Sequence, residues 1–200
     1  CTATGQVLTS FTSEKTVVDL NADFEADLAV KRKTDWESHR ADETRNRIRH
    51  LLRVRPEADF KPPEFEDVGR VNRDDYHVDK LVLRTDSRVL PGLTFHPPVP
   101  VDDAYLYLHD QGKLGDTDTG GPVEQLVAEG YAVVTVDLSG QGETARGKRD
   151  PLLTDWKTYF LSYLLGKPLL GTRVEDTLAA GDFVAYYQKN RDAPRKVHLV

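Results

Sequence analysis

AYLYLHDQGKLGDTDTGGPVEQLVAEGYAVVTVDLSGQGET, residues 104–144, is the stretch of this sequence that decides the fold. Two apolar runs, 104–108 and 131–136, have the near-continuous hydrophobicity of strands that are covered on both faces of a parallel sheet. Between them, Pro122 stands where a first helical residue is expected, and Gly130 follows the apolar positions as a left-handed cap. The pattern predicts a strand, a loop, a helix and a second strand.

Two loops, 109–121 and 138–144, follow the two predicted strands. A helical crossover joins parallel strands, so both loops should lie at the carboxyl ends of the strands, on one rim of the sheet. Ligands bind at this rim in open α/β sheets. We therefore expect the functional residues of this segment in the two loops, and antiparallel pairing of the two strands would overturn that expectation.

The composition sets the class of protein. The 200 residues are 38% hydrophobic and 30% charged, with a formal net charge of −6 and a pI near 5.5. This charge argues against a nucleic-acid surface, and no apolar run reaches the ~20 residues of a membrane span. The single cysteine, Cys1, excludes an intrachain disulfide and is either a lipidated residue or simply the first residue of the chain. A secreted or periplasmic location is slightly favoured, and the oligomeric state stays open.

The chain before residue 70 is interpreted as two segments. Residues 1–20 are expected to form a short strand segment. Residues 21–69 are expected to form a charged helix, with Asn21 as its N-cap, followed by a Pro-rich connector. Thr34 and Glu37 have the spacing of a capping box, so the helix either restarts there or runs through.

Residues 70–200 are interpreted as an α/β unit. Two antiparallel edge strands, 77–85 and 89–96, are expected around an Asp86-Ser87 turn, ahead of the strand–helix–strand segment. The remaining pattern predicts an aromatic helix or lid-like segment at 156–165, a helix at 173–190 capped by Thr172, and a last strand at 196–200. The resulting sheet is expected to be incomplete at its carboxyl end.

The order of elements over residues 76–200 resembles the first half of an α/β-hydrolase. Three motifs support this resemblance: His109-Asp110-Gln111-Gly112, the D-x-x-G-x-G turn at 137–142, and Arg-Val-Glu-Asp at 173–176. Within that superfamily the chain looks similar to acetylxylan esterases and prolyl-oligopeptidase relatives. Residues 1–20 also resemble the tail of a preceding unit in bacterial two-module esterase-like proteins.

The resemblance implies a serine ester hydrolase acting on a small-molecule or polysaccharide ester, of the acetylxylan type. In that fold the strand at 196–200 leads into the nucleophile elbow, so the nucleophile, acid and histidine are expected beyond residue 200 and these residues alone are not expected to be active. A prolyl-oligopeptidase-like peptidase and a non-catalytic, hydrolase-like interaction domain remain the alternatives.

The resemblance also implies candidate site residues. The backbone N–H groups of Gln111 and Gly112 are candidates for an oxyanion hole. His109, Asp110, Lys113 and Gln141 are candidates for substrate binding. Each has a structural alternative: His109 would shape its loop through a hydrogen bond, and the charged loop residues would be solvated.

Other polar and aromatic groups are interpreted structurally. Asp137 is expected to hold the Gly-rich turn rather than to serve as an acid. Arg173 and Asp176 either bind a substrate carboxylate or, as their spacing favours, form a helical pair. Gly181 is expected to mark a close approach to the sheet. The rings of Trp156, Tyr159, Phe160 and Tyr163 either line a sugar subsite or, as their helical spacing favours, pack. The six histidines are scattered through the sequence, so no metal site and no cofactor are predicted.

Overall fold

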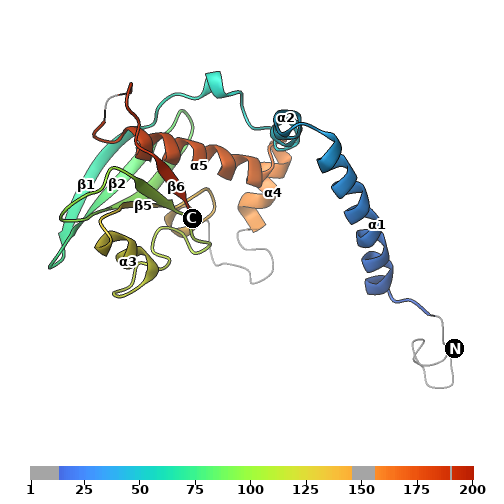
Figure 1. Cartoon of the computed structure of the whole chain (residues 1–200). Helices are drawn as coiled ribbons and strands as arrows, with labels where there is room; N and C mark the ends of the chain where they lie inside the picture. The colour runs from blue at the N-terminus through green and yellow to red at the C-terminus, as the bar shows by residue number, and fades with distance from the viewer. Residues whose placement is uncertain (1–13, 146–155, 190) are drawn as a thin grey trace. The chain divides into compact units, whose positions relative to one another are not determined.

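The computed structural model of the chain describes residues 14–145, 156–189 and 191–200 (Figure 1). The chain divides into two compact units, Cys1–Ile48 and Arg49–Val200. The expected strand segment at 1–20 lies mainly outside the described residues. Within the described part, no helix is both long enough and apolar enough to cross a membrane.

The first unit is built on helix α1, Val17–Ser38. Its N-cap is Thr16, which forms a capping box: the Asp19 N–H donates to Thr16 Oγ1 at 3.1 Å, and the Thr16 N–H donates to the Asp19 carboxylate at 2.8 Å. The predictions of a strand over 16–20 and of an Asn21 N-cap are therefore wrong, because these reciprocal bonds satisfy the first N–H groups of a helix that starts earlier.

Helix α1 runs through the second predicted capping site. The Thr34 hydroxyl donates back to the Val30 carbonyl at 3.1 Å, as it does inside a helix, and α1 ends only at Ser38. A second helix, α2, spans Ala41–Leu51. Neither helix contains a buried residue, so the charged character read from the sequence corresponds to solvent exposure.

The second unit contains a six-stranded mixed sheet in the order β1-β2-β3-β5-β4-β6. β1 pairs antiparallel with β2, β2 with β3, and β3 with β5, whereas β4 pairs parallel with both β5 and β6. The predicted parallel pair and the antiparallel first strands are confirmed. The strands span Glu64–Asn72, His77–Arg84, Val89–His96, Ala104–Tyr107, Ala132–Val136 and Val197–Leu199, from β1 to β6.

Strand β1 is a correction to the sequence interpretation. The expected connector up to residue 69 contains a 3-10 turn at Glu57–Asp59, and then β1, which continues to Asn72. All nine residues of β1 are exposed, so the strand has no buried face that would produce a hydrophobic pattern. Because β1 covers β2, the predicted edge strand 77–85 is internal and β1 is the edge.

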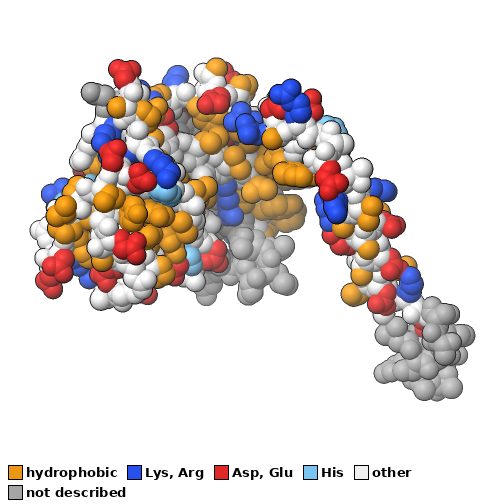
Figure 2. Space-filling view, viewed as in Figure 1, with side chains coloured by type: hydrophobic (Ala, Val, Ile, Leu, Met, Phe, Trp, Pro, Cys, Tyr) orange, Lys and Arg blue, Asp and Glu red, His pale blue; other side chains and the backbone are white. Residues whose placement is uncertain are grey.

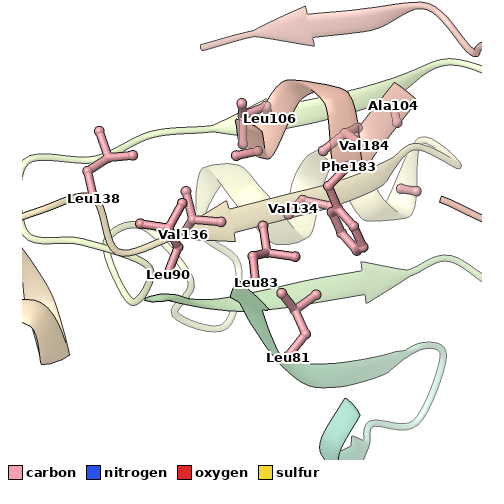
Figure 3. Close-up of a cluster of buried hydrophobic side chains, with 12 residues drawn as sticks. Leu81, Leu83, Leu90, Ala104, Leu106, Val134, Val136, Leu138, Phe183 and Val184 are labelled. Carbon is pink, nitrogen blue, oxygen red and sulfur yellow. The ribbon is translucent and has the colours of Figure 1, made fainter. Parts of the chain in front are cut away.

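Helices cover both faces of the sheet (Figure 1). Helix α5, Leu169–Tyr186, packs on one face through Ala180, Phe183 and Val184 (Figure 3). Helix α3, Pro122–Ala128, packs on the other face through Val123 and Val127. The sheet residues on the α5 face are Leu81, Leu83, Leu90, Ala104, Leu106, Ala132, Val134 and Val136, and those on the α3 face are Val78, Leu93, Phe95 and Val133.

The bounds and contacts of α5 differ from the prediction. The helix begins after Pro168, four residues before the expected start, and ends at Tyr186. A Cβ at Gly181 would meet nothing within 4 Å, so the predicted close approach there is wrong. The close approach is at Gly171, where a Cβ would lie 1.9 Å from the carbonyl oxygen of Leu52.

The aromatic helix α4, Trp156–Leu164, lies at the surface. Figure 2 shows hydrophobic side chains gathered over α4. The rings of Trp156 and Tyr159 each make an edge contact with Phe160, but all three are about half exposed and Tyr163 is 71% exposed. The predicted packing is therefore between neighbouring rings of α4 rather than in the core.

Candidate functional site at the strand ends

The two loops that follow β4 and β5 meet at Asp137, the first residue after β5. Asp137 is fully buried and accepts three hydrogen bonds: from the Lys113 N–H at 2.7 Å, the Lys113 ammonium at 2.6 Å and the Glu143 N–H at 3.0 Å. Its carboxylate thus holds the Gly-rich turn, as expected, and also ties that turn to the preceding loop. The expectation that both loops lie on one rim is confirmed.

Glycines allow this close approach. Gly112 (φ +90°) and Gly142 (φ +47°) both have the left-handed backbone that favours glycine. A Cβ on either residue would come within 2.3 Å of an Asp137 carboxylate oxygen. The two loops can therefore surround the carboxylate only because both positions lack a side chain.

Lys113 is a buried cation rather than a solvated one. Its ammonium contacts Glu143 Oε1 at 2.7 Å as well as Asp137, and only 8% of the residue is exposed. Burial alone would lower the pKa of Lys113, but the hydrogen bonds to Asp137 and Glu143 outweigh burial and raise the pKa above its usual value. Lys113 therefore carries a positive charge inside the rim and balances Asp137.

His109 shapes the loop that it begins. Its Nδ1 accepts the Gln111 N–H at 3.1 Å and lies 3.1 Å from the Asp110 carboxylate, while its Nε2 is 3.8 Å from Asp116. The ring lies against Gly115, where a Cβ would come within 2.1 Å of Nδ1. The ring of His109 thus makes the loop-shaping hydrogen bond that was the structural alternative for this residue.

The two candidate oxyanion donors have partners inside the loop. The Gly112 N–H donates to the His109 carbonyl at 3.1 Å, and the Gln111 N–H is held by the His109 ring. Gln111 is exposed and Gly112 is buried. Gln141 is also buried, and its Oε1 has no hydrogen-bond partner among the described residues. Binding an oxyanion at this loop would require its two N–H groups to exchange partners.

An ion cluster around the buried carboxylate of Asp176 also holds the Gly-rich turn. Asp176 accepts from the Ser139 N–H at 2.9 Å and from Arg88 Nε at 2.6 Å, and Arg173 Nε donates to the Ser139 carbonyl at 2.9 Å. Arg173 and Asp176 were expected to pair with each other or to bind a substrate carboxylate, and the contact with Arg88 was not predicted. Arg88 adjoins the predicted Asp86-Ser87 turn, but its partners are far away in the sequence, so no local pattern revealed them.

Glu175 extends this ion cluster. It is 1% exposed and lies 2.6 Å from the Lys167 ammonium, 2.9 Å from the Arg55 N–H and 3.2 Å from Arg88 Nη2. Burial would raise the pKa of Glu175, but the hydrogen bonds from Lys167 and Arg55 prevail and lower it. Arg55, Arg88 and Lys167 are thereby fixed around the Glu175 carboxylate.

The carboxyl end of β6 reaches the same rim. The Leu108 N–H donates to the Val200 carbonyl at 2.8 Å, and the Val200 N–H donates to the Leu106 carbonyl at 3.1 Å. Val200 is thus paired with the residues that immediately precede His109. The rim consists of the ends of β4, β5 and β6.

Searches with the sequence find neither a matching family model nor a matching curated protein. The structure is similar to a candidate acetyl xylan esterase from Bacteroides fragilis, with a TM-score of 0.61 and 18% identity, over 79% of this chain and 45% of that one. The fold is α/β-hydrolase-like.

Two further solved structures resemble this chain, each with a TM-score of 0.50. One is an acetyl xylan esterase from Paenibacillus sp. R4, with 19% identity over 70% of this chain and 46% of that one. The other is a cold-adapted esterase from an Arctic intertidal metagenomic library, with 20% identity over 66% of this chain and 53% of that one. The chain spans about half the length of the solved structures it matches.

The structure also brings together residues that the sequence analysis left apart. His77, Asp79 and His96 offer ligand atoms that all lie within 4.8 Å of one another, a group that could hold a metal ion. The histidines are therefore not all scattered in space, although they are in sequence. The hairpin turn could have revealed the pair, because a two-residue turn at 86–87 places residue 77 opposite residue 96.

Proposed function

We propose that this hydrolase-like chain forms part of a carboxylic-ester hydrolase that uses a serine nucleophile. One observation carries the proposal: the carboxyl end of β6, at Val200, is hydrogen-bonded beside the start of the His109–Gly112 loop. In α/β-hydrolases a nucleophile elbow follows a strand at this rim, and an oxyanion donor comes from the loop after a neighbouring strand. A serine emerging after β6 would thus face Gln111 and Gly112.

The proposed chemistry is acyl transfer. The serine oxygen attacks the ester carbonyl while a histidine removes its proton, and N–H groups of the His109–Gly112 loop stabilise the oxyanion once they exchange their internal partners. Two of the three structures compared above are described as acetyl xylan esterases or candidates for that activity, which supports an acetylated polysaccharide as the substrate. The proposed substrate contacts from this chain are Asp110, which is exposed, and Gln141, whose Oε1 has no hydrogen-bond partner in the part of the chain that the structure describes.

A non-catalytic interaction domain is the second candidate. It is favoured by one observation, namely that the Gln111 and Gly112 N–H groups both donate inside the loop. A rim that is closed by its own hydrogen bonds needs no substrate to complete it.

Hydrolysis of p-nitrophenyl acetate and release of acetate from acetylated xylan by the full-length protein test the proposal. We expect turnover of both, complete inhibition by a serine-directed phosphonate, and one phosphonylated serine by mass spectrometry. Turnover that survives the phosphonate would refute the serine mechanism. A folded protein with neither turnover nor labelling would favour the interaction domain.

A further inference from the structure

A second polar cluster lies at the opposite end of the sheet from the rim. It borders a cavity of about 610 Å³. The cavity is lined by Ala104 and Ala132, the first residues of β4 and β5, whereas the rim loops follow the last residues of these strands. The cavity is therefore separate from the candidate ester site.

The hairpin of β2 and β3 builds this cluster. In its antiparallel register His77 pairs with His96 and Asp79 pairs with Thr94. Residues two apart on a strand point to the same face, so His77 and Asp79 share the α5 face of the sheet with Thr94 and His96. Two imidazoles, one carboxylate and one hydroxyl thus occupy neighbouring positions on two paired strands.

One pair of side-chain atoms already has the spacing of two ligands on one ion. His96 Nε2 lies 3.2 Å from Asp79 Oδ2. The contact is not aligned as a hydrogen bond, and Nε2 is buried without a hydrogen-bond partner among the described residues. Two ligand atoms on a tetrahedral zinc ion with bonds of about 2.0–2.1 Å are themselves about 3.3 Å apart.

Other buried polar atoms that line the cavity also lack partners. Thr94 Oγ1 and Arg195 Nε are buried and have no hydrogen-bond partner among the described residues. Buried polar atoms in proteins are almost always satisfied by protein, water or a ligand. Together with His96 Nε2, three such atoms around one cavity indicate that the cavity contains polar species.

The charges around the cluster are mixed, because Arg70, Lys189 and Arg195 line the cavity while the carboxylates of Asp79 and Asp67 lie near His96. Arg70 donates to both oxygens of Asp79, from Nε to Oδ1 at 2.5 Å and from Nη2 to Oδ2 at 2.9 Å, and so fixes the carboxylate with Oδ2 beside His96. Carboxylates that bind metals are commonly held by such an outer hydrogen bond. Asp67 on β1 supplies a second negative charge close to His96.

We propose that His77, Asp79 and His96 bind one late first-row divalent cation, with zinc as the ion that best matches two imidazoles and a carboxylate. The His77 and His96 rings are stacked, with centroids 4.5 Å apart, so binding turns the His77 ring until its nitrogen faces the ion. His77 is only partly buried, and rotation about its χ2 is broad and inexpensive. The remaining coordination position faces the cavity.

Isothermal titration of the EDTA-dialysed protein with Zn²⁺ tests this site. We expect one ion per chain, with affinity reduced more than about 100-fold in His77→Asn and in His96→Asn, because losing even an outer partner of a metal ligand costs about 10–100-fold. His198→Asn is the matched control. His198 also contacts a carboxylate, Asp103 at 2.8 Å, but lies outside the cluster. The affinity of the His198→Asn variant for Zn²⁺ should therefore equal that of the wild type. Circular dichroism establishes that each variant is folded.

Titration with Co²⁺ gives an independent spectroscopic readout. The intense visible absorption of a four-coordinate cobalt site should appear in the wild type and in His198→Asn, and should disappear in both cluster variants. Saturating Mg²⁺ should not compete, because hard cations prefer oxygen ligands. Failure of the folded wild type to bind Zn²⁺, or equal affinity in His96→Asn, would overturn the proposal. These outcomes are independent of esterase activity.

Discussion

Asp137→Asn should strongly destabilise the second unit, because the amide replaces a buried carboxylate that accepts three hydrogen bonds. In the best orientation the amide oxygen replaces Oδ2 and keeps the bonds from the Lys113 ammonium and the Glu143 N–H. The amide nitrogen, a donor, then faces the Lys113 N–H, whose bond at 2.7 Å is lost. That bond to a charged group is worth about 1.5–3 kcal/mol, and the Lys113 ammonium also loses its buried anionic partner.

The expected loss is thus about 3–5 kcal/mol, which matches the cost of breaking one side of a buried ion pair. Because Glu143 still balances part of the charge of the Lys113 ammonium, the loss in free energy of unfolding should fall in the lower part of that range. The measurement is urea unfolding at neutral pH, followed by circular dichroism. The slope against denaturant should stay constant while the midpoint falls.

Asp102→Asn is the control for this substitution. Asp102 is paired with Lys189 at the surface, where 69% of its side chain is exposed, so its replacement should cost less than about 1 kcal/mol. Combining Asp137→Asn with Lys113→Met removes both buried charges and should recover part of the loss. If Asp137→Asn costs no more than Asp102→Asn, the carboxylate does not hold the two loops together.

Two further substitutions test local contacts. Gly115→Ala places a Cβ 2.1 Å from His109 Nδ1, so it should lower the free energy of unfolding in urea by about 1–3 kcal/mol and displace the His109 ring signals in NMR spectra. At Gly181 a Cβ would meet nothing within 4 Å, so Gly181→Ala should raise the free energy of unfolding by up to about 1 kcal/mol. Equal effects of the two substitutions would contradict the packing argument. Because the folded-state pKa of Glu175 lies below 4.5, its stabilisation is complete above that pH and is lost as the pH falls through the lowered pKa. Lys167→Met removes the hydrogen bond that contributes most to this lowering, so Glu175 should contribute less stability at neutral pH and the loss of stability on acidification should be smaller than in the wild type; an unchanged acid loss would exclude that role.

The strand–helix–strand segment was predictable because its signals are local. Continuous apolar runs, Pro122 and the left-handed Gly130 each act within a few residues, and the topological rule then placed the two loops on one rim. The start of α1 was missed because Val17 and Val18 have strand-forming side chains. The capping of Thr16 by Asp19 decided the outcome.

Features that depend on distant partners escaped the sequence analysis. Lys113 was predicted either to contact a substrate or to be solvated, and only the fold brings Asp137 and Glu143 to its ammonium. β1 was missed because its nine exposed residues carry no hydrophobic pattern, and its pairing with β2 became evident only in the sheet. The facing histidines of the β2–β3 hairpin were also missed, although the turn alone determines their register and could have revealed them.

The contact between Gly171 and the Leu52 carbonyl has a practical consequence for anyone who shortens this protein. Cutting at residue 70 would remove the chain that covers Gly171, the Arg55 N–H that binds Glu175, and the strand that shields β2. The trimmed product would expose an open β-edge and an undercompensated anion, a combination that promotes aggregation. Expression clones intended to isolate the sheet should therefore retain Arg49 onward.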